Sequence, residues 1–169
     1  MQIIKWITLI LIFISSTYIG ILISKKYLNR VKDLKEMKNA LNIFSTKIKF
    51  TYEPIPKTFN EISKNVKPNI ANIFSSASVK MENTNASKAW SKALEEANTS
   101  MTKEDIEILN NLSNLLGKVD IDGQVSEIEL VEHFLDTQII QAEEEKNKYI
   151  KLYKALGITI GLAITIILI

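Results

Sequence analysis

The chain has 169 residues, no cysteine, one histidine and a formal net charge of +2 at pH 7. The absence of cysteine excludes disulfides, a lipoprotein-type lipid anchor and any thiolate metal site. The length suits one domain of ordinary size rather than two. Hydrophobic residues make up 46% of the chain, and they concentrate in two runs near its termini.

The first run, residues 3–23, is apolar apart from Lys5 near its start. Such a run spans about 31 Å as a helix, which matches a hydrocarbon core of about 30 Å. Lys25 and Lys26 end it, and no A-x-A cleavage site follows. The run is also longer than the apolar part of a usual signal peptide. It therefore predicts a membrane helix over residues 3–24 rather than a cleaved leader.

Residues 25–154 carry apolar side chains at helical spacing and show no recurring strand-like alternation. Pro54 and Pro56 break the chain after the first long stripe, and Pro68 opens or interrupts another helix. Thr102 and Ser126 are each followed three residues later by an acid, which predicts two capping boxes. The expected helices cover residues 28–50, 55–66, 69–82, 86–97, 103–117 and 125–168. The expected fold is all-α, a membrane-anchored bundle of about six helices, with a turn over 117–123.

The second run, residues 155–169, contains no charged side chain. It reaches only about 22 Å as a helix, which is short for a full span. Lys151 and Lys154 can extend it by snorkelling, while the Ile169 carboxylate must stay near the far interface. A buried core helix is the alternative, but no face of this run suits water. We expect a second membrane helix over 155–169, continuous with the last bundle helix.

Basic residues flank the inner side of both runs, and only Lys5 lies on the other side. The positive-inside rule therefore predicts a cytosolic bundle with both termini across the membrane. The flanking residues are Lys25, Lys26, Arg30, Lys32, Lys35, Lys38, Lys146, Lys148, Lys151 and Lys154. Such clusters also suit anionic membrane lipids.

Small residues recur at a spacing of four in both runs. Gly157 and Gly161 form a G-x-x-x-G motif, and Ser16 and Gly20 share its spacing. Small residues at this spacing allow close approach of two membrane helices. Either the two helices pack through these four residues, or the glycines match the motif by chance.

Charge is unevenly distributed along the chain. Residues 25–92 include 14 basic and 5 acidic side chains, whereas residues 93–145 include 2 basic and 14 acidic ones. One interpretation is that the basic and acidic helices neutralise each other within the bundle. The other is that an acidic surface meets a basic partner. The candidate residues for that surface are Glu95, Glu96, Glu104, Asp105 and Glu107.

Catalytic signatures are missing from the sequence. His133 has no metal-ligating companion at helical spacing, and no glycine-rich phosphate loop occurs. The stretch from Asp120 to Glu127 is too short for a calcium loop of the EF-hand type. We therefore expect no enzyme activity, no cofactor and no metal. Nucleic-acid binding is also not expected, because the basic residues are not interleaved with exposed aromatics.

Several local patterns, in order, resemble the stage III sporulation protein AB family over nearly the whole chain. The first is the stretch 48–55, IKFTYEPI, which closes the first long helix. Ala89-Trp90 before Leu94 and the stretch 105–109, DIEIL, come next. The others are Leu116-Gly117 with Asp120 and Gln124, and the terminal membrane run that opens at Leu156-Gly157.

That family resembles the cytosolic F-domain of the inner-membrane platform proteins of type II secretion and type IV pilus machines. The resemblance implies a non-enzymatic part of the channel, or feeding-tube apparatus, between mother cell and forespore, in the mother-cell membrane around the forespore. It implies a stage III sporulation AA-type ATPase and other membrane components of the channel as partners, and a homo-oligomer is possible. Besides the acidic segment, Gly117, Asp120 and Gln124 are interaction candidates. Gly117 also suits a helix C-cap, and Asp120 and Gln124 also suit stabilising the turn or capping the next helix. A membrane-anchored helical sensor or a structural tether stays as the alternative function.

Overall fold

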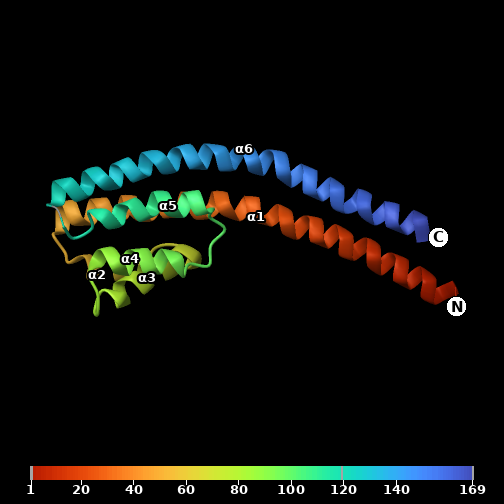
Figure 1. Cartoon of the computed structure of the whole chain (residues 1–169), viewed down its shortest axis with the longest axis horizontal. Helices are drawn as coiled ribbons and strands as arrows, with labels where there is room; N and C mark the ends of the chain where they lie inside the picture. Colours follow the sequence, from red (N-terminus) through yellow and green to blue (C-terminus); the bar gives the residue numbers. More distant parts are fainter. Residues whose placement is uncertain (1, 119, 169) are drawn as a thin grey trace. The chain divides into compact units, whose positions relative to one another are not determined.

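The computed structural model describes residues 2–118 and 120–168, and all its regular elements in these ranges are helices (Figure 1). In chain order they are α1 (Gln2–Thr51), α2 (Ile55–Ser63), α3 (Pro68–Lys80), α4 (Ala86–Glu95), α5 (Lys103–Asn111), the 3-10 helix η1 (Leu112–Asn114) and α6 (Ile121–Leu168). The predicted all-α class is confirmed. The expected position of the Ile169 carboxylate and that of the Lys5 side chain lie outside the described residues.

The contacts divide the chain into two compact units. One unit, here called the helix pair, combines residues 1–31 with residues 141–169. The other, here called the bundle, comprises residues 32–140. Helices α1 and α6 each contribute a segment to both units, and each unit is described by itself.

The helix boundaries correct two sequence-based predictions. Helix α6 begins at Ile121 rather than near 125, because the Asp120 side chain accepts a hydrogen bond from the Gly123 amide at 3.0 Å. Ser126 therefore lies inside α6, where its hydroxyl donates to the Asp122 carbonyl, and the capping box predicted at Ser126 is wrong. The box predicted at Thr102 is confirmed, with both reciprocal hydrogen bonds to Asp105 present.

Helix α1 begins at Gln2 and continues through the residues between the first apolar run and the first expected bundle helix. Residues 24–27 contain neither glycine nor proline, so nothing in them stops a helix. It ends at Thr51, before Glu53 and Pro54. Proline disfavours helical backbone in the residue before it, which explains why α1 stops there.

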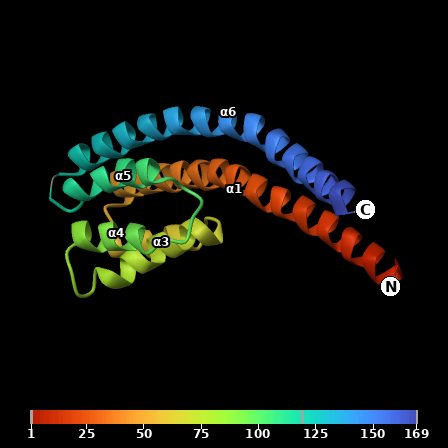
Figure 2. The same cartoon turned by 45° about the vertical axis from the view of Figure 1, so that its right-hand side comes forward.

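Four aromatic side chains from four helices form the centre of the bundle. The Phe59 ring packs edge-on against Phe44, Phe74 and Trp90, with ring centroids 4.9, 5.0 and 5.5 Å apart. The Trp90 indole N–H also donates to the Leu109 carbonyl at 2.9 Å, which ties α4 to α5. All four rings are fully buried. Within the bundle, α2, α3 and α4 gather on one side of the α1 segment, and the α6 segment lies on its other side (Figures 1 and 2).

Candidate functional site

One stretch of each helix in the helix pair exposes an almost entirely apolar surface. Helices α1 and α6 each contain an 18-residue stretch that is long and apolar enough to cross a membrane, and only 17% and 11% of these stretches is buried. Ile7, Leu11 and Ile14 of α1 and Ile166 and Ile167 of α6 are all more than half exposed. A helix of a soluble core would bury such side chains. The exposed surface is consistent with a location in a membrane.

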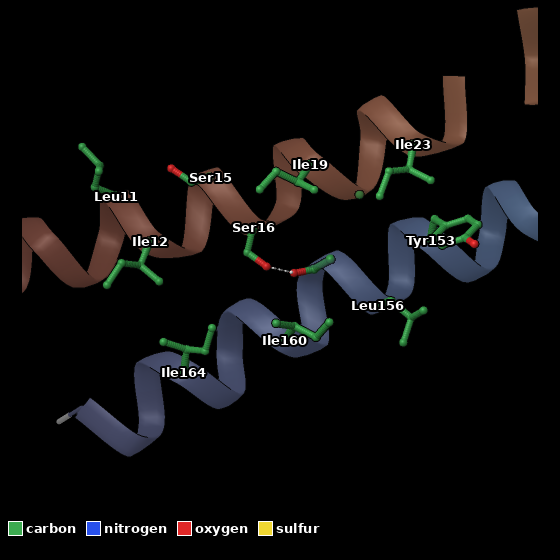
Figure 3. Close-up of a pocket in the computed structure, with 12 residues that line it drawn as sticks. Leu11, Ile12, Ser15, Ser16, Ile19, Ile23, Tyr153, Leu156, Ile160 and Ile164 are labelled. Atoms are coloured by element: carbon green, nitrogen blue, oxygen red, sulfur yellow. Dashed lines mark hydrogen bonds between the residues drawn. The ribbon is translucent and has the colours of Figure 1, made fainter. Parts of the chain in front are cut away.

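The four small residues singled out in the sequence lie together between the two helices of the pair. The Ser16 hydroxyl donates a hydrogen bond of 2.9 Å to the Gly157 carbonyl (Figure 3). A Cβ atom placed on Gly20 would lie 2.5 Å from the Tyr153 carbonyl oxygen and 3.1 Å from the Gly157 Cα. A Cβ on Gly157 would meet the Ser16 carbonyl oxygen at 3.0 Å. The two backbones are therefore in direct contact, and we call Ser16, Gly20, Gly157 and Gly161 the seam.

A side chain at Gly161 would be tolerated better than one at Gly20 or Gly157. A Cβ on Gly161 would meet the Cδ2 atom of the Phe13 ring at 3.0 Å, the Ser16 Cβ at 3.3 Å and the Phe13 carbonyl oxygen at 3.4 Å. The Phe13 ring can rotate away from this contact, and the nearest backbone atom is 3.4 Å away, within ordinary van der Waals contact, whereas backbone atoms are the nearest neighbours of Gly20 and Gly157. The closest approach therefore centres on Gly20 and Gly157, and only the second of these belongs to the G-x-x-x-G motif.

An open groove of about 550 Å³ runs along the seam. Its walls are almost wholly aliphatic, as Ile12, Ile19, Leu156 and Ile160 in Figure 3 illustrate. Few polar groups line the groove, and the Ser16 hydroxyl already donates its hydrogen bond to the Gly157 carbonyl. The groove offers packing surface for hydrocarbon and has no set of groups suited to acid–base chemistry.

Stacked tyrosines and one ion pair join the same two helices on the other side of Gly20. The Tyr27 ring stacks on Tyr149 and Tyr153 at centroid distances of 4.9 and 5.9 Å. Loss of hydration is the main cause that raises the pKa of Tyr27, and a hydrogen bond with Tyr153 raises it further. The Arg30 guanidinium, which is buried, donates to the Glu145 carboxylate at 2.8 Å. The Arg30–Glu145 ion pair and the tyrosine rings suit the boundary between apolar and aqueous surroundings, because each side chain combines an apolar part with a polar end.

The acidic residues proposed as a partner surface fall into different environments in the bundle. Glu95 and Glu107 are exposed and form no ion pair with the described residues, and exposed Glu104 accepts from the Gln138 side chain at 3.1 Å. Glu96 pairs with Lys80 at 2.7 Å, and that hydrogen bond lowers the pKa of Glu96. Asp105 is fully buried and serves the α5 capping box, so it is not available to a partner.

Ion pairs also form inside the bundle between α1 and other helices. Lys38 of α1 pairs with Asp136 of α6 and, like the Lys80–Glu96 pair, joins the basic segment 25–92 to the acidic segment 93–145, whereas Lys47 of α1 pairs with Glu61 of α2 within the basic segment. These pairs favour the interpretation that the two charge classes partly neutralise each other within one bundle. Glu95, Glu104 and Glu107 are the members of the proposed acidic surface that are still exposed and do not pair with a lysine among the described residues.

The residues of the expected 117–123 turn have structural roles. Gly117 has φ +73°, a left-handed conformation that favours glycine at the end of a helix. Asp120 caps the start of α6 through its bond to the Gly123 amide. Gln124 lies half-buried in the first turns of α6.

His133 is exposed on α6 beside the Phe134 ring, at a centroid distance of 6.4 Å.

Phe50 and Tyr52 are surface features that no pattern in the sequence predicts. Their side chains are 71% and 74% exposed, the highest values for any aromatic residue in the bundle. They lie at the end of α1, next to the start of α6, and together line a shallow hollow with Asp120 and Asp122. The only signal in the sequence was their place after the last residue of the first apolar stripe, Ile48.

Comparison with known proteins places this architecture in one family. The family model described as stage III sporulation protein AB matches residues 5–169. Stage III sporulation protein AB of Bacillus subtilis (strain 168) is 24% identical over 168 residues, which is 97% of this chain and 98% of that protein. A solved structure of stage III sporulation protein AB (SpoIIIAB) has the same fold, with a TM-score of 0.66 and 22% identity. The match covers 71% of this chain and 98% of that one. The family match over almost its full length shows that this chain belongs to the stage III sporulation protein AB family.

Proposed function

We propose that this protein is a non-enzymatic platform component of the sporulation channel between mother cell and forespore. The observation that carries the proposal is a helical bundle joined to two apolar helices, in a chain of the stage III sporulation protein AB family. In this role the bundle binds a cytosolic secretion-type ATPase, the stage III sporulation AA-type ATPase. The protein resides in the mother-cell membrane around the forespore and contacts other membrane components of the channel.

The charge distribution supports a cytosolic bundle. Lys25, Lys26, Lys151 and Lys154 are all exposed on the bundle side of the two apolar stretches. Positive charge near the ends of membrane helices favours the cytosolic side. The same lysines are suited to anionic lipid headgroups. This orientation places the bundle in the compartment where an ATPase finds ATP.

The seam supports a closed pair of membrane helices. Close backbone contact and the hydrogen bond from Ser16 to Gly157 are the two kinds of interaction that stabilise helices in lipid, where the hydrophobic effect does not bring them together. In the proposed function, the pair fixes the protein in the membrane as one unit, and the bundle carries the surface for the ATPase.

Glu95, Glu104 and Glu107 are the acidic residues that we assign to ATPase binding. They lie exposed on α4 and α5. Exposed carboxylates attract a basic partner surface and raise its rate of association. The other two acidic residues that the sequence suggests are left out, because Asp105 is buried and Glu96 is paired with Lys80.

Affinity purification from membranes of sporulating cells tests the proposal. The full-length tagged chain should recover the AA-type ATPase, and a variant with Glu104→Lys and Glu107→Lys should recover much less. Glu82→Lys is the matched control, because Glu82 is exposed but lies after α3. Recovery that is equal for all three chains would exclude this surface. Recovery of no channel component by the unaltered chain would contradict the platform role and favour a structural tether.

A further inference from the structure

A hollow at one end of the bundle has the character of a binding site rather than of a closed surface. It has a volume of about 700 Å³ and lies between the end of α1 and the start of α6. Its lining residues are Lys49, Phe50, Tyr52, Asp120, Ile121 and Asp122, and we call it the Tyr52 hollow. Exposed aromatic rings beside carboxylates are unusual on the surface of a bundle that has a complete aromatic core elsewhere.

The backbone conformation at Tyr52 costs the fold energy. Tyr52 has φ +54°, the only positive φ among the described non-glycine residues. At the position after a helix, glycine or asparagine adopts this conformation at lower energetic cost. The Tyr52 ring does not recover that cost by burial, because it is 74% exposed. A strained backbone that presents an exposed aromatic ring is common at sites that bind a partner.

The charges in the hollow select a cationic ligand. Asp122 is exposed and forms no ion pair with the described residues. Asp120 is exposed and uses one oxygen for the Gly123 amide. Lys49 already lies near the Phe50 ring, with its nitrogen 5.9 Å from the ring centroid. The Tyr52 face and the Asp122 carboxylate are therefore the pair of groups that is open to a further cation.

An arginine side chain fits this pair better than other cations. Its planar guanidinium stacks on an aromatic face and donates to a carboxylate at the same time, whereas a lysine ammonium is a compact, strongly hydrated charge. Tyrosine and arginine are also the residues that dominate binding energy at protein interfaces. An anionic lipid surface would be repelled by the two carboxylates.

A second copy of this chain cannot supply the arginine. The chain contains a single arginine, Arg30, which is buried in the helix pair and held by Glu145. We therefore propose that the Tyr52 hollow binds an arginine-bearing segment of a different protein, with the guanidinium between the Tyr52 ring and the Asp122 carboxylate. The inference rests on the proposed function only in that the partner belongs to the same membrane assembly.

Photo-crosslinking in sporulating cells tests the proposal with the full-length chain. Benzoylphenylalanine replaces Phe50, which substitutes one exposed aromatic ring for another, and the same probe at Val79 of α3, which is 60% exposed, is the control. The probe at 50 should capture one protein, and the captured peptide should contain an arginine. Asp122→Asn and Tyr52→Ala should each lower the yield about tenfold or more, as expected for central interface residues. Tyr52→Phe should keep most of it.

Tyr52→Gly separates binding from folding. Glycine relieves the left-handed backbone, so the bundle should be at least as stable as before while the crosslink is lost. Equal yields from positions 50 and 79, a captured peptide without arginine, or a yield insensitive to Asp122→Asn would each overturn the proposal. ATPase recovery is a separate measurement. If the ATPase binds and these variants have no effect on capture, the Tyr52 hollow fails alone. If the ATPase does not bind but capture behaves as described, the platform assignment fails alone.

Discussion

Gly20 is the residue of the helix pair whose substitution should be most damaging. A Cβ on Gly20 would lie 2.5 Å from the Tyr153 carbonyl oxygen, whereas carbon–oxygen contacts in proteins begin at about 3.3 Å. The two backbones must therefore move apart by about 0.8 Å, a shift that takes the Ser16 hydroxyl out of good hydrogen-bonding range of Gly157. Overpacking of this kind costs about 1–3 kcal/mol, and the lost interhelical hydrogen bond about 0.6 kcal/mol more.

The expected consequence is a graded loss of helix packing in which Gly20→Leu exceeds Gly157→Leu, and Gly157→Leu exceeds Gly161→Leu. The order follows from the nearest atoms, which are backbone atoms at 2.5 and 3.0 Å for the first two and a carbon of the Phe13 ring, which can rotate, at 3.0 Å for the third. A cost of about 1.5–3.5 kcal/mol shifts the packing equilibrium roughly 10- to 300-fold.

Disulfide trapping measures this directly, because the chain has no cysteine of its own. A Cβ on Gly161 would lie 3.3 Å from the Ser16 Cβ, close to the range of about 3.5–4.5 Å for a disulfide. Cysteines at 16 and 161 should therefore oxidise rapidly in membranes, as counted by maleimide labelling of the remaining thiols. Gly20→Leu and Gly157→Leu are tested in that background, which already lacks the Ser16 hydroxyl, so that only the overpacking cost of about 1–3 kcal/mol is measured there. Gly161→Leu requires another cysteine pair. Ala163→Leu, at an exposed position, is the control. Trapping that is as fast with Gly20→Leu as with Ala163→Leu would refute the reasoning.

Three further predictions concern the bundle. Phe59→Ala should lower the free energy of unfolding by about 3–5 kcal/mol in chemical denaturation, whereas Val79→Ala should change it by less than about 0.5 kcal/mol. Burial raises the pKa of Glu132, so between pH 4.5 and the raised pKa the folded state binds more protons than the unfolded state. The free energy of unfolding therefore falls as pH rises through this range. Glu132→Gln should remove this loss and raise Tm at pH 7. The hydrogen bond from Lys47 lowers the pKa of Glu61, so its contribution is present above pH 4.5 and is lost as pH falls through the lowered value. Glu61→Gln should therefore abolish the fall in Tm on the acid side. A Tm that falls equally steeply with decreasing pH in Glu61→Gln would contradict the assignment of this loss to Glu61.

Periodicity and helix signals were sufficient to predict the helical fold. The proline positions and the Thr102 capping box marked helix ends that the structure contains. Ser126 shows why local motifs fail: it had the right acid three residues later, but Asp120 offers an earlier cap and Gly123 is tolerated inside the first turn of α6. A helix starts at the first competent cap when nothing downstream of it breaks the helix.

Surface roles were harder to predict because they depend on contacts between distant segments. Asp105 was assigned to an acidic surface although the capping box predicted at the same place already implied that its carboxylate was used. Glu96 is paired with Lys80, 16 residues away, and nothing in the spacing indicates that pair. Phe50 and Tyr52 continue an apolar helix in the sequence, and only the backbone turn at Tyr52 shows that their rings face solvent. The small residues of the two apolar runs lie together in the structure, but Gly20, outside the motif, makes the closest approach.

The placement of the two tryptophans has a spectroscopic consequence. Trp6 is 56% exposed in the helix pair, and Trp90 is fully buried in the bundle, so each unit contains one indole fluorophore of its own. A Trp6→Phe chain reports only the surroundings of the bundle core, and a Trp90→Phe chain reports only the depth of α1 in lipid. Denaturant titrations followed at each emission band therefore reveal whether the bundle melts while the helix pair stays inserted, without any added label.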